Sequence, residues 1–520
     1  MTSSIERRRF NSLLAKLSVG AYAATRSNCL FSGEITQDRL LPNITSGVAS
    51  GDVTHSAATV WSRADRASRM IVELSSNEAF KNVRRIVGPD TFEHSDFTAK
   101  LRLHGLKPGE PQFYRVRFQD LNDMSKISAP VIGRFATPST EPRDIKFTWS
   151  GDTVGQGYGI DLARGGMTTF ETMRNLSPDF FVNSGDVIYA DNPLASEMRL
   201  DDGTLWKNVT IEGKSKVAES LDEFRSNYRY NLMDANVRRL YSEVPTFVQW
   251  DDHETLNNWY PTEQLKDDRY TVKSVSLLAA RAKQAFLDYL PIHASNDGMA
   301  RIYRTIPYGP LLEVFFIDLR SYRGVNSPNR QPEMNDESAY MGKQQLQWLK
   351  SKLKASQATW KVICSDMPIG IIVRDGKDDF ENGANGNGPP LGRELEIADL
   401  LRFIKTSQIK NTVWLTADVH YAASHYYDPE KAVFKDFDPF WEFVSGPLHA
   451  GTFGPGEFDN TFGPQLKFKG IPNGMKGNRP PSDGFQFFGM VKIDAQTRVM
   501  TVNHYNAAGK NLWSIDLPPA

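Results

Sequence analysis

Short runs of apolar residues, broken by turn signals, fill the first part of the chain. The stretches 57–61, 70–74 and 113–118 have the composition and length of β-strands. Leu106-Lys107-Pro108-Gly109 supplies a turn before the last of them. No long helical period interrupts this pattern, so residues 43–138 are predicted to form a small β-sandwich.

After Thr137-Pro138-Ser139 the pattern changes to apolar strands that alternate with stretches of helical period. The stretches 274–290, 341–355 and 391–404 are predicted helices. Such alternation predicts an α/β layered domain, assigned to residues 139–520, with a β-rich closing segment after about residue 435. The expected fold class is therefore α/β, with mixed sheets and flanking helices, preceded by a small all-β sandwich resembling a fibronectin type III module. The Gly/Asn-rich stretch 381–390 is predicted to be a flexible loop.

The N-terminus has the features of an export signal. Arg7-Arg8-Arg9-Phe10 precedes a modestly apolar stretch, and Ala21-Tyr22-Ala23 is a candidate cleavage signature. This pattern resembles a twin-arginine signal, which predicts a leader over residues 1–42, the twin-arginine export machinery as a partner, and a periplasmic or secreted protein. A basic, disordered start is the alternative. No apolar run is long enough to predict a transmembrane helix.

Composition adds little to this picture. The 520 residues are 40% apolar and 24% charged, as in an ordinary soluble globular protein, and the formal net charge of −1 provides no case for a nucleic acid partner. With only two cysteines there is no disulfide framework, and Cys364, in an apolar stretch, is predicted to be a buried structural thiol.

Acids or imidazoles follow directly after four of the predicted strands. The strand at 147–149 precedes Asp152; the strand at 180–182 precedes Asp186 and Tyr189; the strand at 246–250 precedes Asp251, Asp252 and His253; and the strand at 412–415 precedes Asp418 and His420. Open α/β sheets place their sites at the carboxyl ends of strands. Carboxylates gathered there repel one another, and a cluster of cations neutralises them most simply.

Each of these pieces also has a structural interpretation. A Gly-Asp pair after a strand is usually a turn, Asp251-Asp252 could be a solvated loop or a helix cap, and Tyr189 or His420 could be packed in the core. The sequential order of all four segments favours metal binding over these separate explanations.

At these motifs the sequence resembles a known family. Residues 185–191, Gly-Asp-Val-Ile-Tyr-Ala-Asp, are similar to a segment of purple acid phosphatases. Residues 251–254, Asp-Asp-His-Glu, stand where calcineurin-like phosphoesterases carry Gly-Asn-His-Glu. Together with residues 318–323 and 417–420 and the leading β-domain, they resemble the PhoD-type alkaline phosphatases.

The resemblance implies a role for each motif residue. Asp152 would bind a first metal ion, Asp186 would bridge two, Tyr189 would bind ferric iron, Asp252 would bind the second metal, and Asp418 and His420 would complete the shell. His253 would stabilise charge in the transition state or protonate the leaving oxygen. The implied cofactors are Fe3+ and Ca2+, with other divalent metals possible. Asp152 stands where the best-known members have a cysteine ligand, which leaves that metal assignment open.

The function implied is the hydrolysis of phosphate esters by a metal-activated hydroxide or oxo nucleophile. The expected substrate is a small phosphate ester or a phospholipid. Arg320 and Arg323 could clamp phosphate oxygens, or could instead be surface residues or partners of acids. The alternatives are a phosphodiesterase or phospholipase D-like hydrolase on the same site, and a non-catalytic, calcium-stabilised binding protein.

Overall fold

The computed structural model describes residues 41–293 and 301–520. Almost all of the predicted leader, residues 1–42, lies outside the described residues, so export stays a prediction. Within the described part of the chain, no helix combines the length and the apolar character needed to cross a membrane.

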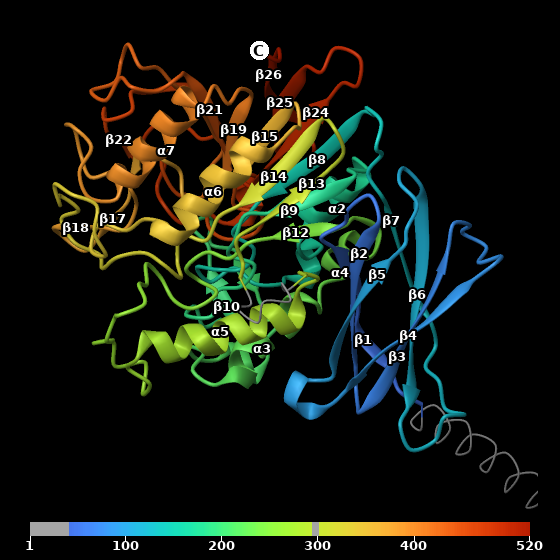
Figure 1. Cartoon of the computed structure of the whole chain (residues 1–520). Coiled ribbons are helices and arrows are strands. Elements are labelled where there is room, and N and C mark those ends of the chain that lie inside the picture. The colour runs from blue at the N-terminus through green and yellow to red at the C-terminus, as the bar shows by residue number, and fades with distance from the viewer. Residues whose placement is uncertain (1–40, 294–300) are drawn as a thin grey trace, which may run out of the picture.

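Two antiparallel sheets form the predicted β-sandwich, coloured blue in Figure 1. One sheet has the order β1-β2-β5 and the other β4-β3-β6-β7. Their strands are β1 (Ile44–Gly51), β2 (Ala57–Ala64), β3 (Ser68–Ser75), β4 (Arg84–Thr91), β5 (Thr98–His104), β6 (Pro111–Asp120) and β7 (Val131–Ala136). In β6, Tyr114, Val116 and Phe118 are buried and alternate with the more exposed Arg115 and Arg117, as a half-buried strand requires. The three strands predicted from the sequence lie within β2, β3 and β6.

The rest of the described chain is built on two larger sheets. The first has the order β12-β9-β8-β24-β25-β26 and the second β13-β14-β15-β19-β21-β20-β23. The strands of the first are β8 (Ile145–Ser150), β9 (Phe180–Asn183), β12 (Thr246–Val248), β24 (Phe487–Ile493), β25 (Met500–Asn506) and β26 (Asn511–Leu517). Those of the second are β13 (Arg304–Pro307), β14 (Leu312–Phe316), β15 (Trp360–Cys364), β19 (Thr412–Thr416), β20 (Ala423–Tyr427), β21 (Phe440–Val444) and β23 (Pro464–Lys469). Both sheets mix parallel and antiparallel pairs, as expected.

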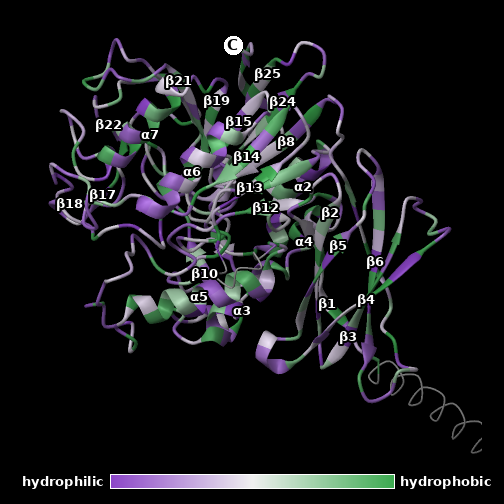
Figure 2. Cartoon of the chain, in the orientation of Figure 1, coloured by the Kyte–Doolittle hydropathy of each residue, from purple (hydrophilic) through white to green (hydrophobic). Residues whose placement is uncertain are grey.

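The two sheets pack face to face. Phe147 and Val182 of the first sheet belong to the same buried cluster as Val362, Cys364 and Leu415 of the second. The helices cover the outer faces, and in Figure 2 they carry both apolar and polar residues, as helices with one buried face do. Cys364 is fully buried, in agreement with its predicted structural role. The result is a layered α/β domain of the predicted class.

The helices agree closely with the apolar periodicity. Those of the first outer face are α2 (Thr168–Asn175), α3 (Leu221–Asn231), α4 (Ala235–Glu243) and α5 (Val275–Tyr289); those of the second are α6 (Lys343–Ala355) and α7 (Glu394–Thr406). The predictions at 274–290, 341–355 and 391–404 correspond to α5, α6 and α7. A capping box between Ser220 and Glu223 begins α3.

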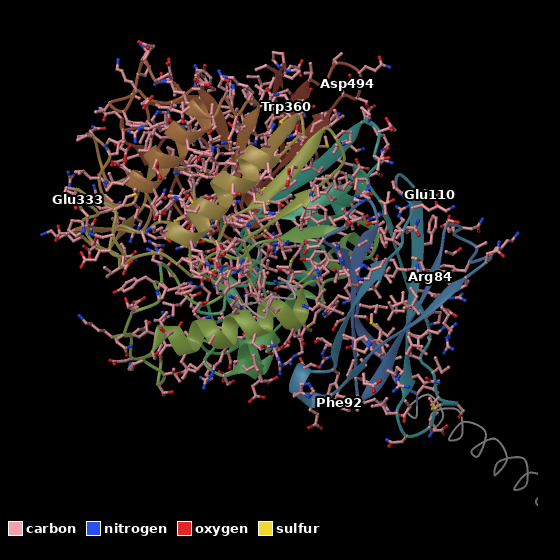
Figure 3. The ribbon with its side chains drawn as sticks, in the orientation of Figure 1. Arg84, Phe92, Glu110, Glu333, Trp360 and Asp494 are labelled. Carbon is pink, nitrogen blue, oxygen red and sulfur yellow. The ribbon has the colours of Figure 1, made fainter. Side chains whose placement is uncertain are left out.

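The described residues also form three two-stranded antiparallel sheets outside these layers. They are β10 (Glu197–Arg199) with β11 (Leu205–Lys207), β16 (Ile371–Ile372) with β22 (Glu457–Phe458), and β17 (Arg374–Asp375) with β18 (Asp379–Phe380). In Figure 3 the labelled Arg84, Phe92 and Glu110 lie on the β-sandwich, and Glu333 lies at the opposite side of the view.

The segment 381–390 is a loop, but its first half is packed rather than free. Glu381, Asn382 and Asn385 are buried, and the Asn382 side chain donates hydrogen bonds to the carbonyls of Pro368 (2.5 Å) and Ile371 (2.7 Å). The prediction of a flexible loop is therefore wrong for residues 381–385. The prediction rested on composition alone, but asparagine side chains in a Gly-rich stretch can also form hydrogen bonds with buried backbone groups and so hold the loop in place.

Candidate metal centre

The carboxyl ends of strands from both large sheets meet at one place. Asp152 follows β8, Asp186 follows β9, Asp252 follows β12, and Asp418 follows β19 of the facing sheet. Three groups of side chains have ligand atoms within 4.8 Å of one another: Asp152, Asp186 and His420; Asp186, Asp252 and His253; and Asp251, Asp252 and Asp418. The structure thus brings together the four segments that the sequence singled out.

The backbone at these positions is unusual. Asp152, Asp186, Asp418 and His420 have φ angles of 60°, 49°, 66° and 60°, in the left-handed region that non-glycine residues seldom adopt. Such conformations persist where the surrounding structure holds them, and they cluster at functional sites.

Gly185 allows two of the strand ends to approach each other. Its φ is +110°, and a Cβ atom at this position would lie 2.5 Å from the Cβ of Asp251. Any side chain here would push the end of β9 away from the end of β12. The Gly-Asp pair is therefore required by packing as well as by its turn.

Among the candidate ligands, Asp152 has the environment that best fits a bound cation. Its side chain is buried, and neither carboxylate oxygen has a hydrogen-bond partner among the described residues. Burial and then the Asp251 carboxylate raise the pKa of Asp152 well above its usual range. A buried carboxylate without donors is costly unless a positive charge compensates it, and a metal ion supplies that charge.

Asp186 occupies the central position. It belongs to both of the groups that contain His420 and His253, so one carboxylate faces two neighbouring sets of ligand atoms. Its Oδ1 accepts a hydrogen bond from the backbone N–H of His253 at 3.1 Å. Burial and the Asp252 charge raise the pKa of Asp186 well above its usual range. This placement fits a bridging ligand.

Tyr189 and His420 face each other at the inner side of the cluster. The Tyr189 hydroxyl lies 2.8 Å from Nε2 of His420, and the other ring nitrogen of His420 lies 2.5 Å from the carbonyl oxygen of Gly451. Burial lowers the pKa of His420 to about 4, so its imidazole is neutral. A neutral imidazole held at Nδ1 by a carbonyl presents Nε2 as a ligand.

His253 is oriented by a carboxylate that the sequence analysis left without a role. Its Nδ1 lies 2.7 Å from Oδ1 of Asp191, whose other oxygen accepts a hydrogen bond from the backbone N–H of Asn257. The ring stacks on Tyr189 with centroids 4.2 Å apart. Burial favours the neutral ring, but the Asp191 and Asp252 carboxylates outweigh it and raise the pKa of His253 to about 10.

Arg320 does not occupy the position expected of a phosphate clamp. Its guanidinium is fully buried, and Nε lies 2.7 Å from Asp251 and 3.1 Å from Asp366. Its other nitrogens contact Glu381 and, at 3.6 Å, Asp418. Four carboxylates therefore engage this side chain, and it compensates their charge instead of facing the cleft.

Arg323 is also buried and held by neighbouring groups. Its side chain is fully buried and donates hydrogen bonds to Asn326 and to the backbone carbonyl of Glu381, and Nη1 lies 3.8 Å from the Glu381 carboxylate. Of the interpretations left open for the two arginines, partnership with acids describes Arg320, whereas Arg323 is held mainly by an amide and a backbone carbonyl.

Sequence reasoning missed Asp191, Asp366 and Glu381. Asp191 stands in the Gly-Asp-Val-Ile-Tyr-Ala-Asp segment, and Asp366 follows β15 as the predicted ligands follow their strands. The positions of Asp191 and Asp366 in the sequence could therefore have identified them as candidate site residues. Glu381 had no such sequence signal, because it reaches the cluster from a long loop. It is identified by its contacts with Arg320 and Arg323 and by its place in the lining of the adjoining cleft.

An open cleft of about 420 Å³ leads to this cluster. Among its lining residues are Asp186, Asp252, His253, Asp418 and His420. A larger cavity of about 960 Å³ lies between the β-sandwich and α3, but it includes none of the predicted site residues. The cleft, and not the larger cavity, is where a substrate would meet the chemistry.

Comparison with known proteins gives consistent matches. The profile of the PhoD-like phosphatase family matches residues 147–504, and that of the PhoD-like phosphatase N-terminal domain matches residues 30–139. Alkaline phosphatase D of Bacillus subtilis (strain 168) is 26% identical over an alignment of 440 positions, which covers 78% of this chain and 69% of that protein.

Two solved structures share the fold. A structure of PhoD, at 20% identity, superposes with a TM-score of 0.66 and covers 91% of this chain and 89% of its own. The purple acid phosphatase PPD1 from yellow lupin (Lupinus luteus) seeds, at 12% identity, has a TM-score of 0.58 and covers 92% and 74%.

Proposed function

The chain belongs to the PhoD-like phosphatase family, and from this premise we propose that it is an alkaline phosphatase D-like enzyme that hydrolyses phosphate esters with bound metal ions. It is a phosphoric ester hydrolase. We propose further which metals it binds, how it is exported and which esters it hydrolyses.

The observation that carries the metal dependence is the buried carboxylate of Asp152, whose oxygens accept no hydrogen bond within the normal distance and angle limits from residues 41–293 or 301–520, and which lies beside Asp186 and His420. A structural turn would satisfy its aspartate with backbone N–H groups. A buried, unpartnered carboxylate next to further acids instead fits a cation site.

The donor set fits hard cations. We assign Asp152, Asp186, Tyr189 and His420 to one ion, and Asp186, Asp252 and Asp418 to a second. Carboxylates and a phenolate dominate, which suits ferric iron and calcium, or magnesium and manganese, better than zinc or copper. When bound, the metals neutralise the phosphate oxygens and lower the pKa of the attacking water.

Residues of the chain itself protonate the leaving oxygen and position the candidate metal ligands. The oxygen of water bonds to phosphorus and the water loses a proton to solvent, the bond from phosphorus to the alcohol oxygen breaks, and that oxygen takes up a proton. His253 lines the cleft and is held at Nδ1 by Asp191, so its Nε2 is free to donate this proton or to stabilise the developing charge. Arg320 acts as a positioning residue by holding Asp251 and Asp418.

Export by the twin-arginine route to the periplasm or the medium completes the proposal. Arg7-Arg8-Arg9-Phe10 and the apolar stretch after it support this. Residues 1–42 fused to a folded reporter should direct it out of the cytoplasm, and an Arg7→Lys, Arg8→Lys, Arg9→Lys fusion should remain inside. Equal export of both fusions would remove the twin-arginine assignment.

Turnover of p-nitrophenyl phosphate and bis-p-nitrophenyl phosphate tests the function. The metal-loaded protein should hydrolyse at least one of them, and the ratio separates a monoesterase from a phosphodiesterase or phospholipase D-like enzyme. Hydrolysis of neither ester by folded, metal-loaded protein would favour the non-catalytic, calcium-stabilised binding protein.

A further inference from the structure

The lining of the cleft combines several kinds of side chain. Besides the carboxylates and imidazoles of the candidate metal centre, it contains the polar side chains of Gln156, Asn257, Asn258 and Arg374. It also contains five apolar residues, which we call the apolar wall: Ile371, Ile372, Val373, Val419 and Phe453. All but Ile371 are partly exposed, so they present carbon atoms to the cleft.

The apolar wall directly adjoins the predicted ligands. Val419 stands between Asp418 and His420 in the chain, and the ring of Phe453 packs edge-on against the ring of His420 with centroids 5.5 Å apart. A phosphate near Asp418 and His420 therefore brings the substituent on its oxygen within reach of these side chains.

Buried polar groups fix the start of the wall. The backbone N–H of Ile369 donates to Glu442 at 2.6 Å, and that of Gly370 donates to the Tyr427 hydroxyl at 2.8 Å. Tyr427 in turn donates to Glu442 at 2.8 Å. Because these partners are buried, residues 371–373 are held in place and are not a loose surface loop.

Gly454 closes the wall from the other side. Its φ is +87°, and a Cβ atom there would lie 2.5 Å from the ring of Tyr421. A Cβ at Gly456 would likewise lie 2.5 Å from Ile371. Both positions need glycine for the segment 453–456 to lie against the wall, so close packing here is built into the sequence.

The wall also reaches the His253 side of the cleft. The Asn258 side chain donates to Asp375 at 3.3 Å, and Asn326 donates to the same carboxylate at 2.9 Å. Asp375 thus joins the segment after Val373 to the turn that follows His253. The apolar surface and the candidate proton donor are held together as one unit.

We propose that the apolar wall binds the alcohol part of the substrate, and that this chain acts on phosphate esters whose alcohol is apolar beside the ester oxygen. This inference rests on the proposed function. Water is excluded from carbon atoms that contact the wall, and each methylene that becomes buried improves binding by roughly fourfold. A sugar or polyol seated on the wall would place hydroxyl groups against carbon atoms, where they lose hydrogen bonds to water.

The test is a series of straight-chain monoalkyl phosphates, from ethyl through butyl to hexyl, with the metal-loaded enzyme. For the wild type, kcat/KM should rise about two- to fourfold per methylene. In the double variant Ile372→Ser, Val373→Ser, the preference for hexyl over ethyl phosphate should fall on the order of tenfold, chiefly through KM. Ethyl phosphate should be affected little.

Val433→Ser is the matched control, because Val433 is 46% exposed and lies outside the cleft. This variant should keep the wild-type dependence on chain length. A wild-type series that is flat, or a double variant whose series runs parallel to the wild type, overturns the role of the wall. A wild type that hydrolyses none of the series, nor p-nitrophenyl phosphate, refutes the proposed function instead.

Discussion

Nδ1 of His253 and Oδ1 of Asp191 lie 2.7 Å apart, although 62 residues separate them in the chain. Because Asp191 fixes the ring, Asp191→Asn should lower kcat by on the order of ten- to a hundredfold while the metal content stays unchanged. His253→Ala should lower it by about a hundred- to ten-thousand-fold. Asp378→Asn, at an exposed carboxylate near the cleft, is the control.

Leaving groups separate proton donation from charge stabilisation in the same variant. p-Nitrophenolate leaves without a proton, whereas an alkoxide needs one. The loss in His253→Ala should therefore be smaller for p-nitrophenyl phosphate than for an alkyl phosphate. Equal losses argue against donation, and loss of metal would make His253 a ligand.

Asp186 is the carboxylate shared by two ligand groups, so Asp186→Asn should abolish hydrolysis in a folded protein. An amide has no charge to share between two cations. Elemental analysis and circular dichroism should accompany the assay, with Asp123→Asn, whose side chain is 45% exposed on the β-sandwich, as control. Activity above about a tenth of the wild type, with intact metal content, removes Asp186 from the bridging role.

Tyr189 gives the metal assignment an optical test. A tyrosinate bound to ferric iron absorbs visible light, so concentrated protein should be coloured and Tyr189→Phe should lose the band. A calcium chelator should inhibit, and calcium rather than zinc should restore activity. Colourless, fully active protein that contains only zinc would refute the iron and calcium assignment.

Arg320 should matter for stability as well as for activity. Arg320→Met leaves Asp251, Asp366 and Glu381 without their shared cation and should lower the free energy of unfolding by about 3–5 kcal/mol. Arg85→Met, at an exposed position of the β-sandwich, should change it little. Urea titration of the two metal-free variants checks this, and equal stabilities would contradict the structure.

His504 should make stability depend on pH. It lies 2.9 Å from the Ser424 hydroxyl; burial, with a smaller effect of His425, lowers its pKa to about 3. The unfolded chain, with an ordinary pKa near 6.5, binds more protons between these values. Protonation therefore destabilises the fold as the pH falls below about 6.5, by up to about 1.4 kcal/mol per unit.

His504→Gln should remove that slope. The groups packed around the imidazole, apart from His425 and Ser424, are the rings of Trp149, Phe443, Phe468 and Trp513. Unfolding free energies at pH 7.5, 6 and 5 measure the effect, and the exposed His104→Gln is the control. Identical slopes for the wild type and His504→Gln would show that another group titrates.

The positions of the candidate metal ligands were predictable from the sequence because they depend on local pattern. Each apolar strand ends where the next residues must turn, and the acids placed there, such as Asp152 and Asp418, point at a common edge in any layered sheet of this kind. The helices were predictable for the same reason, since the apolar period of α5 is local.

Contacts between distant segments were not predictable. The sequence around Arg320 is compatible with a phosphate clamp, and only the three-dimensional structure places Asp251, Asp366 and Glu381 around it. The buried part of the Gly/Asn-rich loop was missed in the same way. Whether an arginine meets a ligand or an acid depends on which long-range partners fold against it.

Strand β8, which leads to Asp152, has β9 on one side and β24 on the other. The Ser150 hydroxyl donates to the carbonyl of Phe487 across 337 positions of sequence. During synthesis, one edge of β8 therefore stays unpaired until almost the whole chain has left the ribosome. An open strand edge of this kind can pair with other chains, so intermolecular strand pairing is a hazard for the nascent molecule until β24 pairs with β8.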